Sequence, residues 1–163
     1  MTILSSLSYS NDKIKVEEVF MLNDHLDNLG LVNLMYEKHD HLRNMVDTLW
    51  EEQSDIKISH TEWYIMHKIF GNKPTISDVS KNVTITRQAT HKNIKSLQAK
   101  GLVEVSNSDR SKRDKCISLT RLGEQCCYKN NELKQSLEQK VATIIGENRL
   151  KDLIDIFKMD WGL

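Results

Sequence analysis

The chain has 163 residues, of which 28% are charged, 6% are aromatic and only seven are glycine or proline. This length suits one domain or one compact protomer, and so few turn residues exclude β-sandwiches, β-barrels, collagen-like chains and low-complexity chains. The formal net charge is zero, and the longest run of strong hydrophobes, Val19–Leu22, is far shorter than the roughly 20 residues of a membrane span. No secretory signal pattern opens the chain. We therefore expect a mostly helical, cytoplasmic protein without membrane association.

The N-terminal third contains one long predicted helix. Residues 1–24 lack sustained hydrophobic periodicity, which predicts a loosely attached or partner-dependent arm. From Leu26 to Trp50, apolar residues recur at spacings of three and four, which predicts a helix of about 25 residues. Such a helix exceeds what a small globule usually needs.

Two shorter helices follow, each with its own start signal. Ser59 and Glu62 have the spacing of a capping box, with Ile58 placed for a hydrophobic staple, and they predict a helix over 60–70. Thr75 and Asp78 repeat the capping-box spacing and predict a second helix of about two turns.

A third predicted helix, 87–100, has two distinct faces. Thr86 can cap its start and Gly101 can end it in a left-handed conformation. At 100° per residue, Thr90, Ile94 and Leu97 share the inner face. The outer face carries polar side chains able to donate hydrogen bonds, namely Arg87, Gln88, His91, Lys92 and Lys95.

The last third combines a hairpin with two helices. Residues 102–106 and 116–120 alternate in hydrophobicity and predict a two-stranded hairpin. Its polar loop, 107–115, carries four cations on a projecting tip. Beyond it, apolar stripes over 133–145 and 150–161 flank Gly146 and predict two amphipathic helices.

Positive charge gathers where the short helices and the hairpin lie. Between Lys81 and Lys115 there are nine cations and three carboxylates, a net charge of +6 in an otherwise acidic chain. A helix, a turn, a second helix with a basic outer face and a basic hairpin make a winged helix-turn-helix, whose second helix enters the DNA major groove while the hairpin reaches the adjacent minor groove. We therefore predict DNA contacts by Thr86, Arg87, Gln88, His91, Lys92, Lys95, Arg110, Lys112 and Arg113.

In order and spacing, the segments 58–63, 75–79, 86–90, 97–103 and 119–123 resemble the MarR family of bacterial transcriptional regulators. The resemblance implies a mainly α homodimer with a small β-hairpin wing that binds pseudo-palindromic operators in double-stranded DNA, represses transcription and, in many members, releases DNA when a small molecule or an oxidant arrives. It divides the chain into an N-terminal arm (1–24), an N-terminal dimerisation helix (25–56), a winged helix-turn-helix module (57–120) and C-terminal dimerisation helices (121–163).

The chain departs from the family at the wing. The family's usual wing aspartate falls on Ser111, whereas its wing-tip arginine falls on Arg113. The resemblance therefore carries over the role of Arg113, while Asp109 or Asp114 could substitute for the missing aspartate.

An effector site and several alternative functions remain open from the sequence. Trp63, Met66, His67 and Phe70 could line a pocket for a small aromatic effector, as in relatives that bind phenolic ligands, or could be ordinary core. A winged-helix protein that binds other proteins would be favoured by an acidic or apolar outer face on the third helix, which this chain lacks.

Metal-responsive and redox-responsive regulators are further alternatives. His39 and His41 point about 200° apart on a helix, so they cannot chelate one ion as a local pair, and His25 and Glu37 do not change our prediction of no metal site. The odd number of cysteines, Cys116, Cys126 and Cys127, fits reduced structural thiols. No nucleophile–base pair or phosphate-binding glycine loop is present, so we predict no enzymatic activity and no cofactor.

Overall fold

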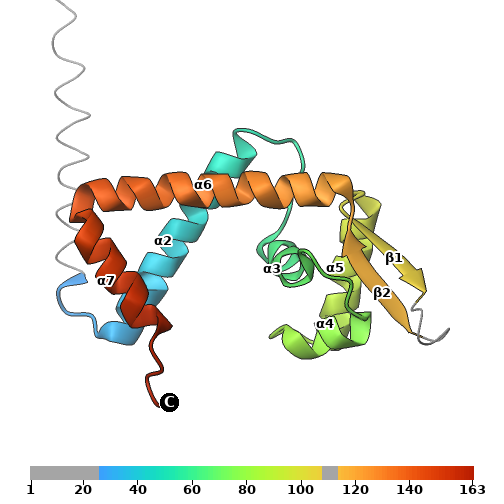
Figure 1. Ribbon diagram of the computed structural model, residues 1–163, viewed down its shortest axis with the longest axis horizontal. Helices are drawn as coiled ribbons and strands as arrows, with labels where there is room; N and C mark the ends of the chain where they lie inside the picture. Colours follow the sequence, from blue (N-terminus) through green and yellow to red (C-terminus); the bar gives the residue numbers. More distant parts are fainter. Residues whose placement is uncertain (1–25, 108–113) are drawn as a thin grey trace, which may run out of the picture. The chain divides into compact units, whose positions relative to one another are not determined.

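The computed structural model describes residues 26–107 and 114–163, in two units that meet between Met45 and Val46. The elements of the described residues are α2 (Leu31–Glu51), α3 (His60–Ile69), α4 (Ile76–Asn82), α5 (Arg87–Ala99), β1 (Val103–Asn107), β2 (Lys115–Leu119), α6 (Arg121–Ile145) and α7 (Glu147–Lys158) (Figure 1). The predicted fold class, mainly α with a small β-hairpin, is confirmed. No described helix is long and apolar enough to cross a membrane.

The start of α3 is the capping box that the sequence predicts. The Ser59 side chain accepts a hydrogen bond from the backbone N–H of Glu62, and the Glu62 carboxylate accepts one from the backbone N–H of Ser59 at 2.7 Å. Two otherwise unpaired backbone donors are satisfied together, which stabilises the first turn. The side chains of Ile65, Met66 and Ile69 on this helix are fully buried in the core.

The start of α4 differs from the prediction. Thr75 caps the backbone N–H of Asp78 at 3.1 Å, but the Asp78 carboxylate accepts a hydrogen bond from the Thr75 hydroxyl instead of from the Thr75 backbone. Aspartate is one methylene shorter than the glutamate of a full capping box, so its carboxylate meets the nearer hydroxyl. The helix nevertheless begins at the predicted residue.

The hairpin between α5 and α6 is antiparallel. Val103 pairs with Leu119 and Val105 with Ile117, so the alternating apolar residues share one face, as predicted. Each strand differs from the prediction by one residue at its ends, since terminal pairing depends on both strands. A third segment joins the hairpin, because the Ile117 N–H donates to the Pro74 carbonyl and Thr75 forms a bridge with Cys116.

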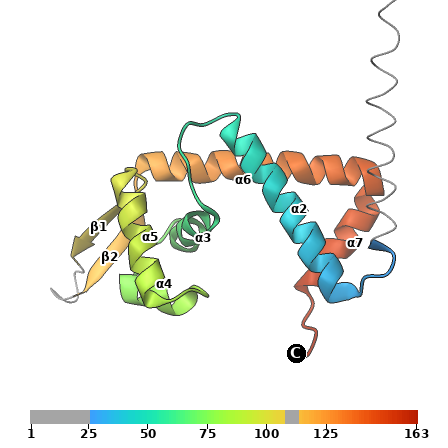
Figure 2. The same ribbon diagram turned by 180° about the vertical axis from the view of Figure 1, so that it is seen from behind.

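The first turn of α6 lies directly against the turn that ends α5. Thr120 caps α6 through Gly123, and its hydroxyl also donates to the Gly101 carbonyl at 2.6 Å. A Cβ on Gly123 would clash with the Leu102 carbonyl oxygen. Glycine is therefore required here for close approach. Figures 1 and 2 show α6 leading away from the hairpin, with α7 beyond its far end.

Two predicted helix ends are corrected by the structure. The first long helix begins at Leu31 instead of near Leu26, and Gly30 separates it from a short turn. The last helix ends at Lys158, so Trp161 lies beyond it and not on its predicted stripe. Trp161 still joins the helix, because its indole stacks on Phe157 at 5.9 Å and donates to the Ile156 carbonyl.

The close approach at Gly123 generates the first prediction. In the Gly123→Ala variant the added methyl meets the Leu102 carbonyl, which belongs to the backbone and cannot rotate away. We expect a loss of about 1–3 kcal/mol in the free energy of unfolding, measured by urea denaturation. Gly30→Ala is the matched control, because a Cβ there has no neighbour within 4 Å. Equal stability of the two variants would contradict this account of the junction.

Candidate nucleic-acid interface

Helix α5 is held in the winged module by its inner face and by both of its ends. Thr90, Ile94 and Leu97 are buried, as predicted for the inner face. At its start, the Thr86 hydroxyl accepts from the Ala89 N–H, and at its end the N–H of Leu102 donates to the carbonyl of Leu97 around Gly101, whose φ is +71°. This pairing around a left-handed glycine is a Schellman motif.

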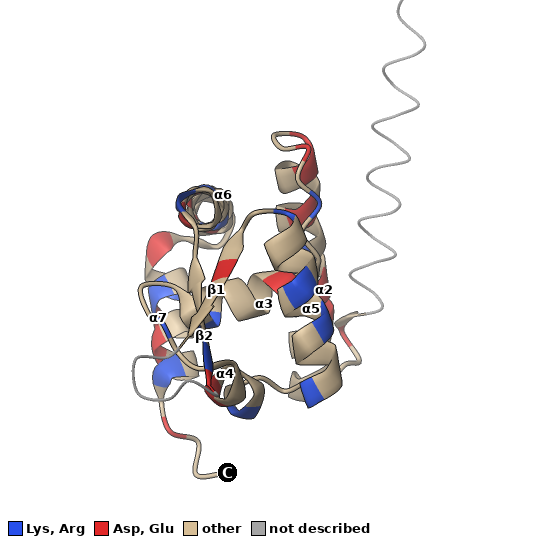
Figure 3. Cartoon of the chain, turned by 90° about the vertical axis from the view of Figure 1, so that its right-hand side faces the viewer, with Lys and Arg blue, Asp and Glu red and all other residues tan. Residues whose placement is uncertain are grey.

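The opposite face of α5 is exposed and basic, and Figure 3 shows the Lys and Arg positions along α5 in blue. All six residues of this helix start and outer face that the sequence predicts as DNA contacts are exposed, and we call them the outer face of α5: Thr86, Arg87, Gln88, His91, Lys92 and Lys95. Within the described residues, no carboxylate forms an ion pair with Arg87, Lys92 or Lys95. These cations are therefore available to an anionic partner.

The predicted wing contacts Arg110, Lys112 and Arg113, like Ser111, lie outside the described residues. What is described is the base of the hairpin, where Lys115 Nζ donates to the Asn107 side chain across the two strands. The strands thus remain paired as far as Asn107 and Lys115.

A cavity of about 210 Å³ adjoins the start of α5 and adds residues that the sequence analysis missed. Three hydroxyls, two basic side chains, His91 and one carboxylate line it together with Ile76: Thr75, Ser77, Ser80, Arg87, Lys115, His91 and Asp114. Ser77 and Ser80 are three residues apart and therefore share one face of α4, which is the signal that could have identified them. The Ser77 hydroxyl and the neighbouring cations are suitable groups for binding a phosphate oxygen, whereas the Ser80 hydroxyl donates to the Ile76 carbonyl.

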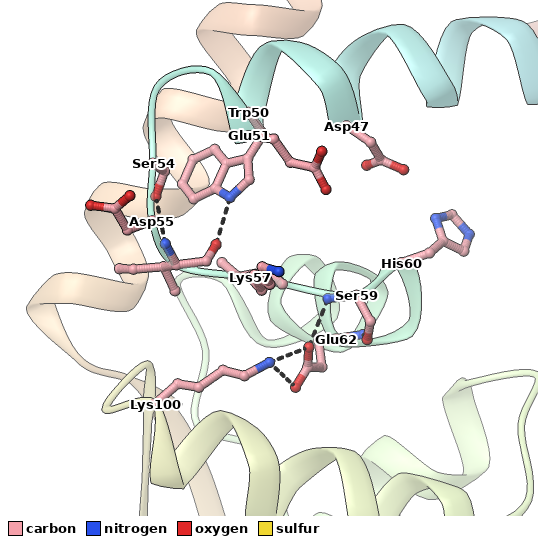
Figure 4. A pocket seen from close by; sticks show the side chains of 12 residues that line it. Asp47, Trp50, Glu51, Ser54, Asp55, Lys57, Ser59, His60, Glu62 and Lys100 are labelled. Atoms are coloured by element: carbon pink, nitrogen blue, oxygen red, sulfur yellow. Dashed lines mark hydrogen bonds and ion pairs between the residues drawn. The ribbon is translucent and has the colours of Figure 1, made fainter.

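A partly buried ion pair, in which Glu62 is buried and Lys100 is partly exposed, holds the N-terminal turn of α3 to the C-terminal end of α5 (Figure 4). Lys100 Nζ lies 2.7 Å from both carboxylate oxygens of Glu62, whose side chain is only 3% exposed. Burial raises the pKa of Glu62, but the Lys100 ammonium, the Ser59 backbone and the Ser96 hydroxyl outweigh that effect and hold the pKa below its usual value. Glu62 is thus ionised at neutral pH and stabilises the scaffold behind the outer face of α5.

A larger cavity, about 600 Å³, lies beside this ion pair (Figure 4). Trp50, Ile56 and Ile58 supply its apolar wall. Its carboxylates outnumber its lysines: Asp47, Glu51, Asp55 and Glu62 against Lys57 and Lys100. The predicted effector residues are not part of its lining.

The four predicted effector residues lie in or beside the core. Met66 is fully buried, and Trp63 is 6% exposed and packs edge-on against Trp50. His67 stacks on Trp63, while Phe70 packs edge-on against Tyr128 of α6. These contacts are those of packed side chains, and an effector pocket at these residues stays a prediction.

The cysteines of the described residues are free and buried. Burial raises the pKa of Cys126, and burial together with the adjacent Cys126 raises the pKa of Cys127 to about 11. Both thiols are therefore protonated at neutral pH and are poor nucleophiles. Within the described residues, no group of three or more histidine, cysteine, aspartate or glutamate side chains is placed to hold a metal ion.

Comparisons with known proteins show what this sequence and fold resemble. Residues 58–123 match the family model described as a winged helix DNA-binding domain. The fold resembles wild-type MarR from E. coli in its apo form (TM-score 0.66, 20% identity, 80% of this chain and 96% of that chain). It also resembles MepR, a transcription regulator of the Staphylococcus aureus multidrug efflux pump MepA, with a TM-score of 0.65 and 17% identity over 79% of this chain and 94% of that chain. A mutant E. coli MarR complexed with operator DNA has a TM-score of 0.59 and 21% identity over 78% of this chain and 89% of that chain. No curated protein matches the chain by sequence.

The Glu62–Lys100 ion pair generates a prediction about stability and pH. In Glu62→Gln, Lys100 loses its anionic partner, and we expect the free energy of unfolding to fall by about 1.5–3 kcal/mol at pH 7. The folded-state pKa of Glu62 lies below its ordinary value of 4.5. The carboxylate's contribution is therefore complete above pH 4.5 and is lost as the pH falls through the folded-state pKa.

Urea denaturation of wild type and Glu62→Gln between pH 7 and pH 3 measures this effect. The matched control is Lys81→Gln, which removes an exposed ion pair with Asp78 and is expected to change stability by less than about 1 kcal/mol. A difference between wild type and Glu62→Gln that stays constant down to pH 3 would contradict the assignment.

Proposed function

We propose that this chain, which has the fold of MarR and MepR and carries a winged helix DNA-binding domain, is a homodimeric transcriptional repressor that binds pseudo-palindromic operators. The observation that carries the proposal is the outer face of α5, which is exposed, polar and basic, whereas the inner face is locked into the core. The operator-bound MarR among the similar structures supports the same reading.

Recognition of DNA follows from how α5 is held. A major groove admits one helix, and residues at the N-terminus of that helix reach the base edges. Arg87 can donate two parallel hydrogen bonds to a guanine, and Gln88 can pair with an adenine. Lys92 and Lys95, farther along the helix, are suited to backbone phosphates, which set affinity but not sequence.

The wing is proposed to reach the adjacent minor groove. In the sequence, Arg110, Lys112 and Arg113 come between β1 and β2. A narrow A·T-rich minor groove attracts arginine because its electrostatic potential is the most negative. Neither one helix nor one loop binds tightly alone, which favours two modules on two half-sites.

Dimerisation is proposed to use the helices outside the winged module, assigned to 25–56 and 121–163. On and just after α7, five large hydrophobic side chains are between 40% and 63% exposed: Leu153, Ile156, Phe157, Met159 and Trp161. Leu31, Val32 and Tyr36 of α2 are also exposed. Apolar side chains gathered at this density on a helix are typical of a face that a partner covers, and the occupant proposed here is a second copy.

Regulation by a small aromatic effector is part of the proposal, with Trp63, Met66, His67 and Phe70 as the candidate site. Since bacterial operators lie in the cytoplasm, the protein is proposed to act there. The buried, protonated cysteines do not favour a redox trigger.

The direct test is to select bound fragments from a random or genomic DNA pool and to titrate the selected duplex at several salt concentrations. We expect a pseudo-palindrome with half-sites about one helical turn apart. The logarithm of the affinity is expected to fall linearly with the logarithm of salt concentration, by about 0.9 for each phosphate neutralised. Enrichment of no sequence by folded, dimeric protein would contradict the proposal.

Single substitutions test the residues. Arg87→Ala and Arg113→Ala are each expected to weaken operator binding by about 1–3 kcal/mol with unchanged folding, measured by fluorescence anisotropy and circular dichroism. The control is Lys68→Ala, an exposed lysine on α3 that removes the same charge elsewhere. If Lys68→Ala reduced affinity as much as the other two, a general charge effect would replace the proposed contacts.

A substitution on the exposed apolar face of α7 tests whether that face forms the dimer interface. Ile156→Asp places a carboxylate on the exposed apolar face, and we expect the dimer to dissociate at micromolar concentration because an unpaired charge in an apolar interface is strongly disfavoured. Analytical ultracentrifugation measures the change. Lys151→Asp, on the opposite face of the same helix, controls for the added carboxylate. A dimer of unaltered affinity in Ile156→Asp would exclude this face.

A further inference from the structure

Two basic side chains meet directly between α3 and α6. His67 Nε2 lies 2.9 Å from Lys134 Nζ, and both side chains are half-buried. A neutral imidazole can accept a hydrogen bond from an ammonium, whereas an imidazolium cannot. The contact therefore requires a neutral His67 ring whose Nε2 carries no proton and accepts the hydrogen bond from the Lys134 ammonium.

The described residues around this contact supply no ion-paired carboxylate, and Glu124 of α6 acts electrostatically on the neighbouring Cys127 thiol. From α3, the Trp63 indole stacks on the His67 ring at 5.9 Å. From α6, the buried side chains of Asn130 and Cys127 lie beside His67 and Lys134, and the Cys127 thiol is protonated at neutral pH. Among the described residues, neither His67 nor Lys134 forms an ion pair with a carboxylate. Protonation of His67 therefore places two positive charges in contact without an ion-paired carboxylate.

The ionisation of both groups agrees with this geometry. Burial lowers the pKa of His67, the positive charge of Lys134 lowers it further, and the Asn130 side chain opposes the change. Burial also lowers the pKa of Lys134, which the neighbouring Cys127 opposes. Since the pKa of His67 is lower in the folded chain than in the unfolded chain, stability is lost as the pH falls below 6.5 toward the folded-state pKa.

We propose that the His67–Lys134 contact is an acid-sensitive latch between α3 and α6: protonation of His67 removes its acceptor, sets two cations against each other and loosens α3 from α6. Helix α3 packs on α5, and α6 is one of the proposed dimerisation helices. Opening of the latch therefore changes how the two reading helices of a dimer are spaced. Operator affinity then decreases on acidification, and this last step rests on the proposed function.

The first arm of the test needs no DNA. An imidazolium stacked on an indole quenches its fluorescence, so wild type is expected to lose emission with a midpoint below pH 6.5. In His67→Gln, which keeps an acceptor for Lys134 but cannot titrate, that transition is expected to disappear. Trp63→Phe assigns the signal, and NMR titration of the His67 ring gives the same midpoint by a second method. A ring midpoint at or above 6.5, or the same quenching in His67→Gln, would overturn the latch.

A second variant keeps this arm informative. Lys134→Met removes the neighbouring cation, and the His67 midpoint is expected to rise toward the ordinary value of a histidine. An unchanged midpoint in folded Lys134→Met would overturn the proposed role of Lys134. Urea denaturation at pH 8 establishes that each variant is folded.

The second arm measures affinity for the selected operator at pH 8 and pH 5.5. The comparison is between wild type and His67→Gln, which share every other ionisable group, so that the difference between them reports His67 alone. We expect affinity to fall about tenfold on acidification, and His67→Gln to abolish that loss. Equal pH dependence of affinity in wild type and His67→Gln would overturn the regulatory step. Absence of operator binding at both pH values would overturn the proposed function, and the fluorescence experiment would then decide whether the latch exists.

Discussion

The structure of the winged module depends on the close approach between the Leu102 carbonyl and the first turn of α6. Only Gly123 permits that distance, because a Cβ there would lie far inside van der Waals contact with the carbonyl oxygen. Thr120 completes the junction, since its backbone N–H donates to Leu102 and its hydroxyl to Gly101. The end of α5, both strands of the hairpin and the start of α6 therefore meet at one point. The position of the C-terminal end of α5 is therefore fixed in part by backbone contacts.

The Glu62–Lys100 ion pair stabilises the same end of α5 from the other side. A carboxylate with its side chain 3% exposed is tolerated because it is satisfied by an ammonium and by the Ser59 backbone at once. One residue thus caps α3 and anchors α5. With the inner side of α5 held so firmly, its outer face can remain exposed and carry cations without disturbing the fold.

The two half-buried basic groups at the α3–α6 contact stand in contrast to that ion pair. Glu62 and Lys100 have opposite charges and reinforce each other, whereas His67 and Lys134 share a hydrogen bond only while one of them is neutral. The first contact stabilises the module at neutral pH, whereas the second, in the proposed latch, makes the attachment of α3 to α6 dependent on pH.

The sequence by itself determined the features that depend on near neighbours. The caps at Ser59 and Thr86, the glycine end at Gly101 and the two faces of α5 all follow from residues within one or two turns of each other, where backbone geometry leaves few choices. The hairpin faces were likewise readable from alternation. For the outer face of α5 the structure adds exposure, while its contacts with DNA stay predictions.

Only the tertiary structure decided the contacts between residues far apart in the chain. Thr75 bridges to Cys116, Glu62 pairs with Lys100 across 38 positions, and His67 meets Lys134 across 67. No local pattern indicates such pairs, because a lysine that forms a buried contact has the same neighbours in sequence as one that remains in solvent. Which polar side chains become paired is determined when helices pack, since burial removes water and makes each unsatisfied charge costly.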